Sequence, residues 1–296
     1  MSTKATSRLR ALLALVLALA AAVTLAACGG DDDDNSSTAA SGGGAATTSS
    51  DGGAGVDPIN AGRLTVGMNL QFKPQMYLEG GQPAGYDVEL LRELAPATGL
   101  ELDIQNLDFN GLIPGLQGNK FDIVSVGLSP TEERRQVVDF SRAYVPYAQV
   151  IAAAPDRAAE ITSPDVLNES GKRIVALQGS TAEQLARRMF PEATVNGLPD
   201  QNAAFLEAAT GRADAIIVED YLLAQFEASN RGQIAKAADE RPLDVQYGSY
   251  AVPKGNEAFV AFLDRWLCEK QTDGTLEKIY KRAFGVEEMP PMPDDC

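Results

Sequence analysis

The chain has 296 residues, with 25 Lys and Arg, 41 Asp and Glu and no histidine, so its formal net charge at pH 7 is −16. An acidic chain argues against a nucleic-acid partner, because the phosphate backbone is itself negative. The absence of histidine excludes Ser-His-Asp and Cys-His nucleophiles and histidine-ligated metals. We therefore expect no catalytic centre of those kinds and no metal or other cofactor.

Residues 1–27 predict a secretory signal peptide, because a basic start is followed by an apolar stretch and then by small residues. The segment Leu-Ala-Ala-Cys that ends at Cys28 resembles a lipobox, in which the cysteine carries the lipid of a bacterial lipoprotein. The alternative is a transmembrane anchor, but residues 11–27 fall short of the ~20 that a span needs. We predict lipidation at Cys28 and a location on the outer face of the cell membrane. Without the three basic residues of the signal peptide, the net charge changes from −16 to −19.

Residues 28–56 predict a flexible tether. After Cys28 this segment contains only Gly, Ala, Ser, Thr, Asp and Asn before a final Val, with no Lys or Arg. Such a composition does not bury an apolar core. The tether would hold the folded part of the chain away from the membrane.

Alternating strand and helix patterns from Arg63 onward predict an α/β fold with two units in succession. The first unit comprises strand 63–68, helix 86–97, strand 100–104, a short helix from Phe109 and strand 122–126. The second comprises strand 173–177, helix 181–189, a strand near Val195, helix 202–209, strand 213–218 and helix 221–227.

Two extended apolar runs, residues 149–154 and 245–252, bracket the second unit, and helices 256–272 and 274–284 follow. The second unit is therefore predicted to be inserted into the first. We expect two lobes, each a mixed sheet flanked by helices, with residues 57–148 and 249–296 in lobe 1 and residues 149–248 in lobe 2. The two runs would cross between the lobes, and a ligand would bind in the cleft.

Residues 122–141 carry the strongest local signal for a binding site. A β-branched strand ends at Gly127, and Ser129-Pro130-Thr131-Glu132 has the pattern of an N-cap, a proline at N1 and a glutamate at N3. The hydroxyl of Ser129, the free amides and Arg134 would then lie within one helical turn. Such a corner suits a carboxylate, although an ordinary capping box with a surface arginine has the same pattern.

Cys268 and Cys296 are the remaining thiols in an oxidising compartment if Cys28 carries lipid. Cys268 belongs to an amphipathic helix and lies about half a rotation from Phe259, on its outer face. We predict a Cys268–Cys296 disulfide that fixes the C-terminus. Two free thiols are the alternative.

Several segments in this order resemble the amino-acid-binding solute-binding proteins (family 3) of ABC importers, which have the type II periplasmic-binding-protein fold. They are GYDVELLRELAPATGL, DFNGLIPGLQGNKFDIV, GLSPTEER followed by VDFS, LQGST, VPKGN and DGTLEKIYKRAFG, between Arg63 and Phe284. The resemblance implies a two-lobed receptor that closes over an α-amino acid and delivers it to an ABC permease. A monomer is expected.

The resemblance also implies roles for individual residues. Arg134 would bind the α-carboxylate of the ligand, with the Ser129 hydroxyl and the Gly127 amide. Ser180 and Thr181, which open a helix in the second unit, would complete this carboxylate site from the other lobe. For both of these residues, helix capping alone is the alternative.

Glu219 lies where most relatives carry the aspartate that receives the ligand's α-ammonium. The glutamate keeps the charge but is one methylene longer. The neighbouring Asp220 could receive the ammonium instead, or it could be a helix N-cap. Val126 replaces a hydroxyl that some relatives use for the ammonium. The resemblance therefore assigns that contact to an acidic residue alone.

The resemblance places Phe72 and Phe109 around the ligand side chain, although buried core phenylalanines are the alternative. Asn69 stands at a position that is acidic in cation-binding relatives, and Gln71 and Gln75 could offer amide hydrogen bonds. We therefore expect a neutral, polar ligand side chain.

Two other functions remain open at this point. Some proteins of this fold act as cyclohexadienyl or arogenate dehydratases with a buried acid as proton donor, and Glu219 would fit that role if its pKa were raised. An amino-acid sensor would share every ligand residue with a transport receptor.

Overall fold

The computed structural model describes residues 55–239, 241–293 and 296, and these belong to one compact unit, residues 50–296. The predicted signal peptide, the lipidation at Cys28 and nearly all of the predicted tether lie outside the described residues. Every helix in the described part is too short or too polar to cross a membrane.

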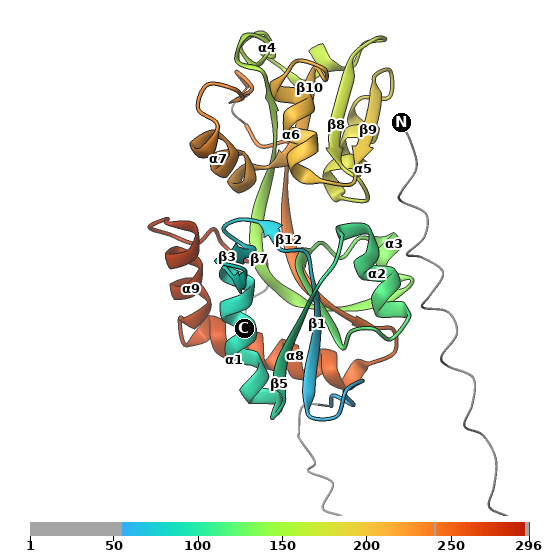
Figure 1. The fold of residues 1–296 in the computed structure, drawn as a ribbon, viewed down its shortest axis with the longest axis vertical. Helices are drawn as coiled ribbons and strands as arrows, with labels where there is room; N and C mark the ends of the chain where they lie inside the picture. The colour runs from blue at the N-terminus through green and yellow to red at the C-terminus, as the bar shows by residue number, and fades with distance from the viewer. Residues whose placement is uncertain (1–54, 240, 294–295) are drawn as a thin grey trace, which may run out of the picture. The chain divides into compact units, whose positions relative to one another are not determined.

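Strands and helices alternate along most of the chain (Figure 1). The strands are β1 (Arg63–Met68), β2 (Gln71–Phe72), β3 (Met76–Glu79), β4 (Gln82–Ala84), β5 (Glu101–Asn106), β6 (Ile123–Leu128), β7 (Val138–Ala153), β8 (Arg173–Leu177), β9 (Thr194–Leu198), β10 (Ala215–Glu219), β11 (Ala235–Lys236) and β12 (Asp244–Pro253). The helices are α1 (Tyr86–Thr98), α2 (Phe109–Gln117), α3 (Glu132–Arg135), α4 (Pro155–Glu160), the 3-10 helix η1 (Pro164–Leu167), α5 (Thr181–Met189), α6 (Gln201–Ala209), α7 (Asp220–Ser229), α8 (Glu257–Thr272) and α9 (Thr275–Phe284).

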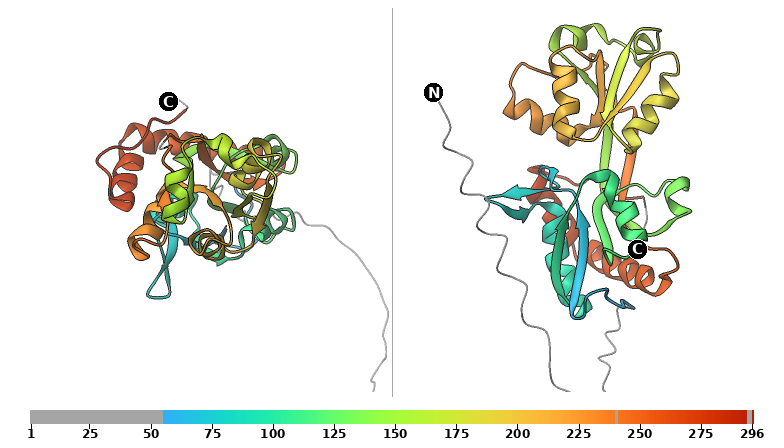
Figure 2. Two further views of the ribbon diagram at one scale, coloured as in Figure 1. Left: turned by 90° about the horizontal axis from the view of Figure 1, so that it is seen from above. Right: turned by 45° about the vertical axis from the view of Figure 1, so that its right-hand side comes forward.

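Two long strands, β7 and β12, connect the two halves of the folded part (Figures 1 and 2). The main sheet has the order β5-β1-β6-β12-β7-β10-β8-β9, with β11 also paired to β7. β12 pairs with β6 at one end and with β7 along its length, and β7 continues into an antiparallel pairing with β10. We call the half with β1, β5, β6, α1, α2, α3, α8 and α9 the first lobe, and the half with β8, β9, β10 and α4 to α7 the second lobe.

The predicted two-lobed α/β fold with two crossover segments is confirmed. β1, β8 and α5 have the predicted bounds, and the other predicted helices and strands, apart from the long strand β7, differ from theirs by a few residues at most. The residue boundaries proposed for the lobes stay a prediction, because β7 and β12 belong to both.

Two parts of the fold were not predicted. The three-stranded sheet β2-β3-β4 lies apart from the main sheet, with Gly80 and Gly81, both at positive φ, in the turn between β3 and β4. β7 is also far longer than the predicted run from Gln149 to Ala154. Its first half was not predicted, because Arg142 and Pro146 interrupt the apolar pattern there.

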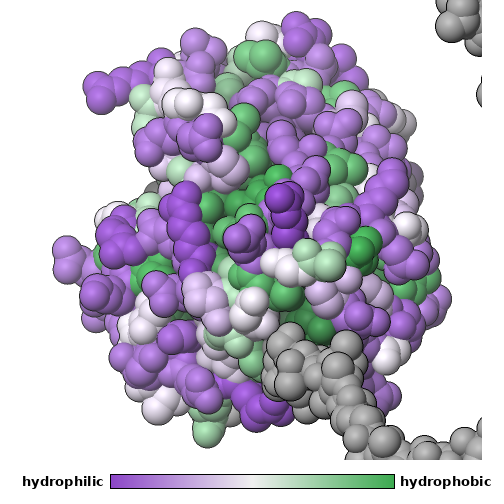
Figure 3. Space-filling view, turned by 60° about the horizontal axis from the view of Figure 1, so that its bottom comes forward, coloured by the Kyte–Doolittle hydropathy of each residue, from purple (hydrophilic) through white to green (hydrophobic). Residues whose placement is uncertain are grey.

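The apolar core follows the sheet through both lobes. One buried cluster extends from Leu64 and Leu91 in the first lobe to Ile216 and Phe226 in the second, and a smaller cluster around Ile174 and Phe190 lies within the second lobe. On the face in Figure 3, polar residues cover most of the surface, and apolar residues are visible mainly in the hollow near its middle.

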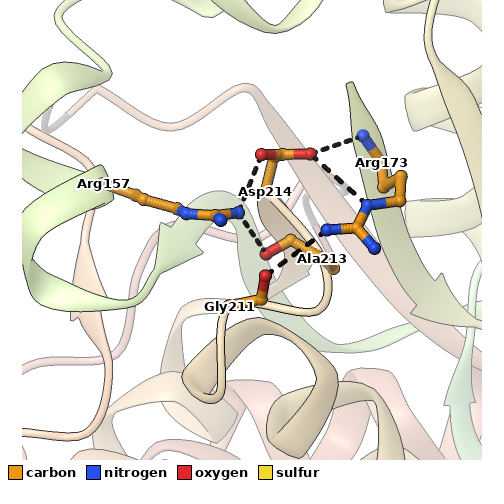
Figure 4. A network of polar contacts seen from close by, with 5 residues as sticks. All are labelled: Arg157, Arg173, Gly211, Ala213 and Asp214. Atoms are coloured by element: carbon orange, nitrogen blue, oxygen red, sulfur yellow. Dashed lines mark hydrogen bonds and ion pairs between the residues drawn. The ribbon is translucent and has the colours of Figure 1, made fainter. Parts of the chain in front are cut away.

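The second lobe has a polar network at the start of β10 (Figure 4). The carboxylate of Asp214 accepts hydrogen bonds from Nη1 of Arg157 at 2.7 Å and from the backbone N–H of Arg173 at 2.8 Å. Arg157 also donates to the carbonyl of Ala213 at 3.1 Å. These contacts join α4, β8 and β10, and so fix the strand whose other end carries Glu219.

Cys268 on α8 and Cys296 at the C-terminus lie side by side, with their Cα atoms 5.5 Å apart. This separation falls within the range of disulfide-bonded cysteines. The tail of the chain therefore returns to the outer side of α8, as the helical pattern predicts.

Candidate functional site

A small cavity of about 30 Å³ lies between the lobes, around the ends of β6, β8 and β10. Its lining comprises Phe72, Gln75, Phe109, Val126, Gly127, Leu128, Arg134, Tyr147, Leu177, Ser180, Thr181, Glu219, Tyr221 and Leu222. A volume of this size holds only one or two water molecules. Entry of a larger ligand therefore requires the lobes to separate or the side chains to rearrange.

Arg134 connects the two lobes in this cavity. The residue is buried, with 6% of its surface exposed. Its Nη1 donates to the carbonyl of Ser129 at 3.0 Å, and its Nη2 donates to the carbonyl of Gly179 in the second lobe at 2.9 Å. The guanidinium also lies 5.9 Å from the ring centre of Phe109, within the range of a cation–π contact. Burial lowers the pKa of Arg134, so an anion beside the guanidinium would offset the loss of hydration.

The expected N-cap at Ser129 is wrong, because the short helix α3 begins two residues later. Thr131 is the N-cap, and its side chain accepts a hydrogen bond from the N–H of Arg134 at 3.3 Å. The Ser129 hydroxyl instead lies 2.5 Å from the Tyr147 hydroxyl. The Ser129 hydroxyl therefore does not cap the helix. It lies beside the cavity, next to Tyr147, but Ser129 is not among the residues that line the cavity.

Thr181 and Ser180 open α5 on the opposite side of the cavity. The Thr181 hydroxyl accepts a hydrogen bond from Nε2 of Gln149 at 2.8 Å. The Ser180 hydroxyl accepts from the N–H of Glu183 at 3.1 Å and donates to the carbonyl of Leu177 at 2.7 Å. The hydrogen bonds of the Ser180 side chain are thus those of a helix cap, whereas the Thr181 hydroxyl interacts with Gln149 and with the Tyr147 hydroxyl.

Gly127 is in the left-handed region, with φ of 61°, and approaches Gln75 so closely that a Cβ atom would lie 2.4 Å from its Nε2. The Gly127 N–H donates to the Tyr144 hydroxyl at 2.8 Å, and that hydroxyl donates to the carboxylate of Asp87. Burial raises the pKa of Asp87 to about 6, against hydrogen bonds from Tyr144, Ser125 and Gln75. The amide assigned to a ligand carboxylate therefore already has a protein acceptor.

Glu219 ends β10 with its side chain in the cavity, and burial raises its pKa from 4.5 to about 7. Asp220 lies outside the cavity lining. Its Oδ1 accepts from the backbone N–H groups of Tyr221 at 2.8 Å and of Ala148 at 3.4 Å. Of the two adjacent acids, Glu219 is therefore the one placed to meet a ligand in this cavity.

Phe72 and Phe109 form one wall of the cavity, with ring centres 6.2 Å apart and planes at 77°. Gln75 is beside them, and its Oε1 accepts from the Tyr221 hydroxyl of the second lobe at 2.6 Å. Its Nε2 donates to Asp87 at 3.0 Å. Gln75 thus joins the buried carboxylate of the first lobe to the second lobe.

Asn69 and Gln71 do not line the cavity. The Asn69 amide donates to the carbonyl of Leu107 at 2.6 Å, within the first lobe. Gln71 accepts from the N–H of Gln201, at the start of α6, at 3.1 Å. In the described arrangement these two side chains support the fold and the contact between the lobes.

Sequence reasoning missed Tyr147, Gln149 and Tyr221. Tyr147 and Gln149 lie two residues apart on β7, so they share one face of the strand. That spacing is a weak signal, because the sequence does not indicate which face meets the cavity. Tyr221 was assigned only to a helix, and its contact with Gln75 joins residues far apart in the chain.

Within residues 55–239, 241–293 and 296, no group of three or more Cys, Asp and Glu side chains is arranged to hold a metal ion. The donors that surround the cavity are instead a guanidinium, hydroxyls and one carboxyl group. Such a set suits a small molecule that carries charges of both signs.

The sequence profile of the bacterial extracellular solute-binding proteins, family 3, matches residues 64–286. The chain belongs to this family. Its predicted membership and its two-lobed type II fold are thereby confirmed.

The arginine-binding extracellular protein ArtP of Bacillus subtilis (strain 168) is 30% identical over 227 residues, which cover 76% of this chain and 87% of that protein. The crystal structure of the ancestral amino acid-binding protein AncCDT-1, a precursor of cyclohexadienyl dehydratase, shares 30% identity with a TM-score of 0.69 and covers 75% of this chain and 96% of its own. Cyclohexadienyl dehydratase of Pseudomonas aeruginosa is 25% identical over 221 residues, 74% of this chain and 82% of that protein. Proteins similar to this chain thus include both binding proteins and an enzyme.

The raised pKa of Glu219 predicts a specific dependence of stability on pH. Between pH 4.5 and about 7 the folded chain binds a proton that the unfolded chain has released, so the contribution of Glu219 to stability falls as the pH rises through this window. Glu219→Gln removes this effect. The melting temperature of the variant, relative to that of the unsubstituted protein, should be higher at pH 8 than at pH 5, as measured by thermal denaturation without amino acid. An identical difference at the two pH values would contradict the assignment.

Proposed function

We propose that this protein is an extracytoplasmic receptor that binds an α-amino acid between its lobes and delivers it to an ABC permease. The observation that carries the proposal is the position of Arg134, a buried guanidinium hydrogen-bonded to carbonyls of both lobes. A ligand carboxylate that replaces one of these carbonyls would favour the closed state over the open one. That difference is what a ligand needs to shift a conformational equilibrium.

Arg134, Ser129 and Thr181 are proposed as the principal carboxylate contacts. Ser180 and the Gly127 amide remain in the proposed set, but support for them is weaker because both already have partners within the protein. Glu219 is proposed to receive the α-ammonium, since its carboxyl group is in the same cavity and Asp220 is engaged by backbone amides.

A neutral polar side chain is the proposed ligand class. Glu219 is the one acidic residue among those that line the cavity, and the ammonium uses it. A cationic side chain would then lack an acidic partner, and an anionic one would compete for Arg134. The aromatic pair Phe72 and Phe109 and the Gln75 amide instead offer apolar contact and hydrogen bonding. Asn69 and Gln71 would contribute only indirectly, through the positions of the loops that carry them.

The proposed cellular setting follows from the first 56 residues. A signal peptide, a lipid on Cys28 and a flexible tether would hold a monomeric receptor on the outer face of the cell membrane, beside its permease. The lobes are proposed to divide near residues 148 and 249, where the crossover strands pass between them.

A disulfide between Cys268 and Cys296 is part of the proposal, supported by their Cα separation of 5.5 Å and by the extracytoplasmic setting. Mass spectrometry after alkylation without reductant should then find no modified thiol at either position. Alkylation of both cysteines in the folded protein would contradict the proposed Cys268–Cys296 disulfide.

Arg134→Ala should abolish stabilisation by amino acids while leaving the fold intact. Thermal shift with each of the twenty L-amino acids provides the measurement. A ligand at 100 times its dissociation constant stabilises by ~2.7 kcal/mol, or roughly 5–10 °C for a domain of this size. Loss of the guanidinium removes charge-assisted hydrogen bonds and should reduce the shift to near zero.

Arg135→Ala is the matched control, because Arg135 is the next residue on α3 and its exposed side chain, which donates to the carbonyl of Pro130 and lies over the Phe140 ring, is not part of the cavity lining. This variant should keep the full shift. Equal shifts from the Arg134→Ala protein and the unsubstituted protein would refute the carboxylate assignment.

A dehydratase acting on cyclohexadienyl acids is the second candidate, favoured by Glu219. With a pKa of about 7, this acid would keep a proton for donation near neutral pH. A cyclohexadienyl dehydratase is similar to this chain, at 25% identity. Incubation of the purified protein with prephenate or arogenate should give no turnover if the receptor proposal is right. Turnover that Glu219→Gln removes would establish the enzyme instead.

A further inference from the structure

Strand β7 places Tyr147 and Gln149 next to each other at the junction of the two lobes. The two residues are two positions apart and share one face of the strand. Both are buried, Gln149 completely and Tyr147 to 9% exposure. Gln149 also lies directly opposite Glu219 in the antiparallel pairing of β7 with β10. The crossover strand therefore places Tyr147 in the cavity lining and Gln149 beside Thr181, which also lines the cavity.

Together these side chains contact one hydroxyl of each lobe, and the Tyr147 hydroxyl also hydrogen-bonds the Thr181 hydroxyl. The Tyr147 hydroxyl lies 2.5 Å from Oγ of Ser129 in the first lobe. Nε2 of Gln149 lies 2.8 Å from Oγ1 of Thr181 in the second lobe. These two hydroxyls are the ones proposed above to bind the ligand carboxylate, together with Arg134.

Hydrogen-bond chemistry sets the direction of these contacts. The amide nitrogen of Gln149 only donates, so the Thr181 hydroxyl accepts from it and turns its own proton toward another acceptor, either the Tyr147 hydroxyl or a ligand. Either hydroxyl of the Tyr147–Ser129 pair can donate, and the phenol, being the more acidic, is the favoured donor, which leaves the Ser129 proton for another acceptor. Burial, with the nearby Glu219 carboxylate, raises the pKa of Tyr147 to about 12, so this proton is retained at neutral pH.

We propose that Tyr147 and Gln149 are positioning residues, which turn the hydroxyl protons of Ser129 and Thr181 toward the carboxylate of the bound ligand. The inference rests on the proposed function, because it needs a carboxylate in the cavity. A single crossover strand then orients one donor from each lobe, so the donors converge when the lobes close. Pre-oriented donors bind an anion more tightly, because little ordering is left for the ligand to induce.

Double-mutant cycles test the proposal, because a residue that acts through another has no further effect once that other residue is gone. The probe is the L-amino acid that gives the largest thermal shift with the unsubstituted protein, and its dissociation constant is measured by titration calorimetry. Tyr147→Phe, Ser129→Ala, Gln149→Leu and Thr181→Val should each weaken binding by about five- to tenfold. If Gln149→Leu does not fold, Gln149→Met takes its place.

Within each pair the effects should not multiply. Tyr147→Phe with Ser129→Ala, and Gln149→Leu with Thr181→Val, should bind within about twofold of the weaker single variant. The crossed combination of Gln149→Leu with Ser129→Ala, whose hydrogen bonds are to different partners, should show the product of the two single effects. Tyr247→Phe, a change of the same kind on the neighbouring strand β12 and away from the cavity lining, should leave the affinity unchanged.

Two results would overturn the inference, and they are distinguishable. If the unsubstituted protein binds an amino acid but the effects multiply within each pair, Tyr147 and Gln149 act independently and only this inference fails. If none of the twenty amino acids shifts the melting temperature of the unsubstituted protein, the proposed function fails and this inference fails with it.

Discussion

The structure depends on one buried positive charge between two lobes. The Arg134 guanidinium is removed from water, and its donors reach carbonyls of Ser129 in one lobe and Gly179 in the other. Neutral carbonyls compensate a buried cation less well than an anion does. The site therefore favours a carboxylate between the lobes. A short helix, the helix start at Thr181 and the crossover strand β7 converge on that point.

Glu219 is the acidic group of the site, and burial raises its pKa. Glu219 is held at the end of β10, whose other end is fixed by the Asp214 network, and no basic residue contributes to the shift of its pKa to about 7. A ligand ammonium would supply the missing charge and lower this pKa, so binding would release a proton from Glu219 near neutral pH. The same raised pKa is what a proton-donating enzyme would use, so both of the functions considered would depend on Glu219.

Local pattern was sufficient to predict elements such as β1, β8 and α5, because their apolar runs and caps lie within a few residues. Local pattern also pointed to Arg134, and the family resemblance added Thr181, Glu219, Phe72 and Phe109; all five line the cavity. The sequence did not indicate that Thr131, rather than Ser129, caps α3, because both have a capping side chain and the choice depends on Tyr147. The roles of Gln149 and Tyr221 were not predicted, because their hydrogen-bond partners are 32 and 146 residues away in the chain.

The most direct test of the account compares one ligand with and without its α-carboxylate. Titration calorimetry would measure the dissociation constant of the amino acid that binds best and that of its α-carboxamide, which keeps the ammonium and the side chain. Two or more charge-assisted hydrogen bonds depend on the carboxylate in this account, so the amide should bind at least about 100-fold more weakly. Equal affinity for the two compounds would contradict the role given to Arg134.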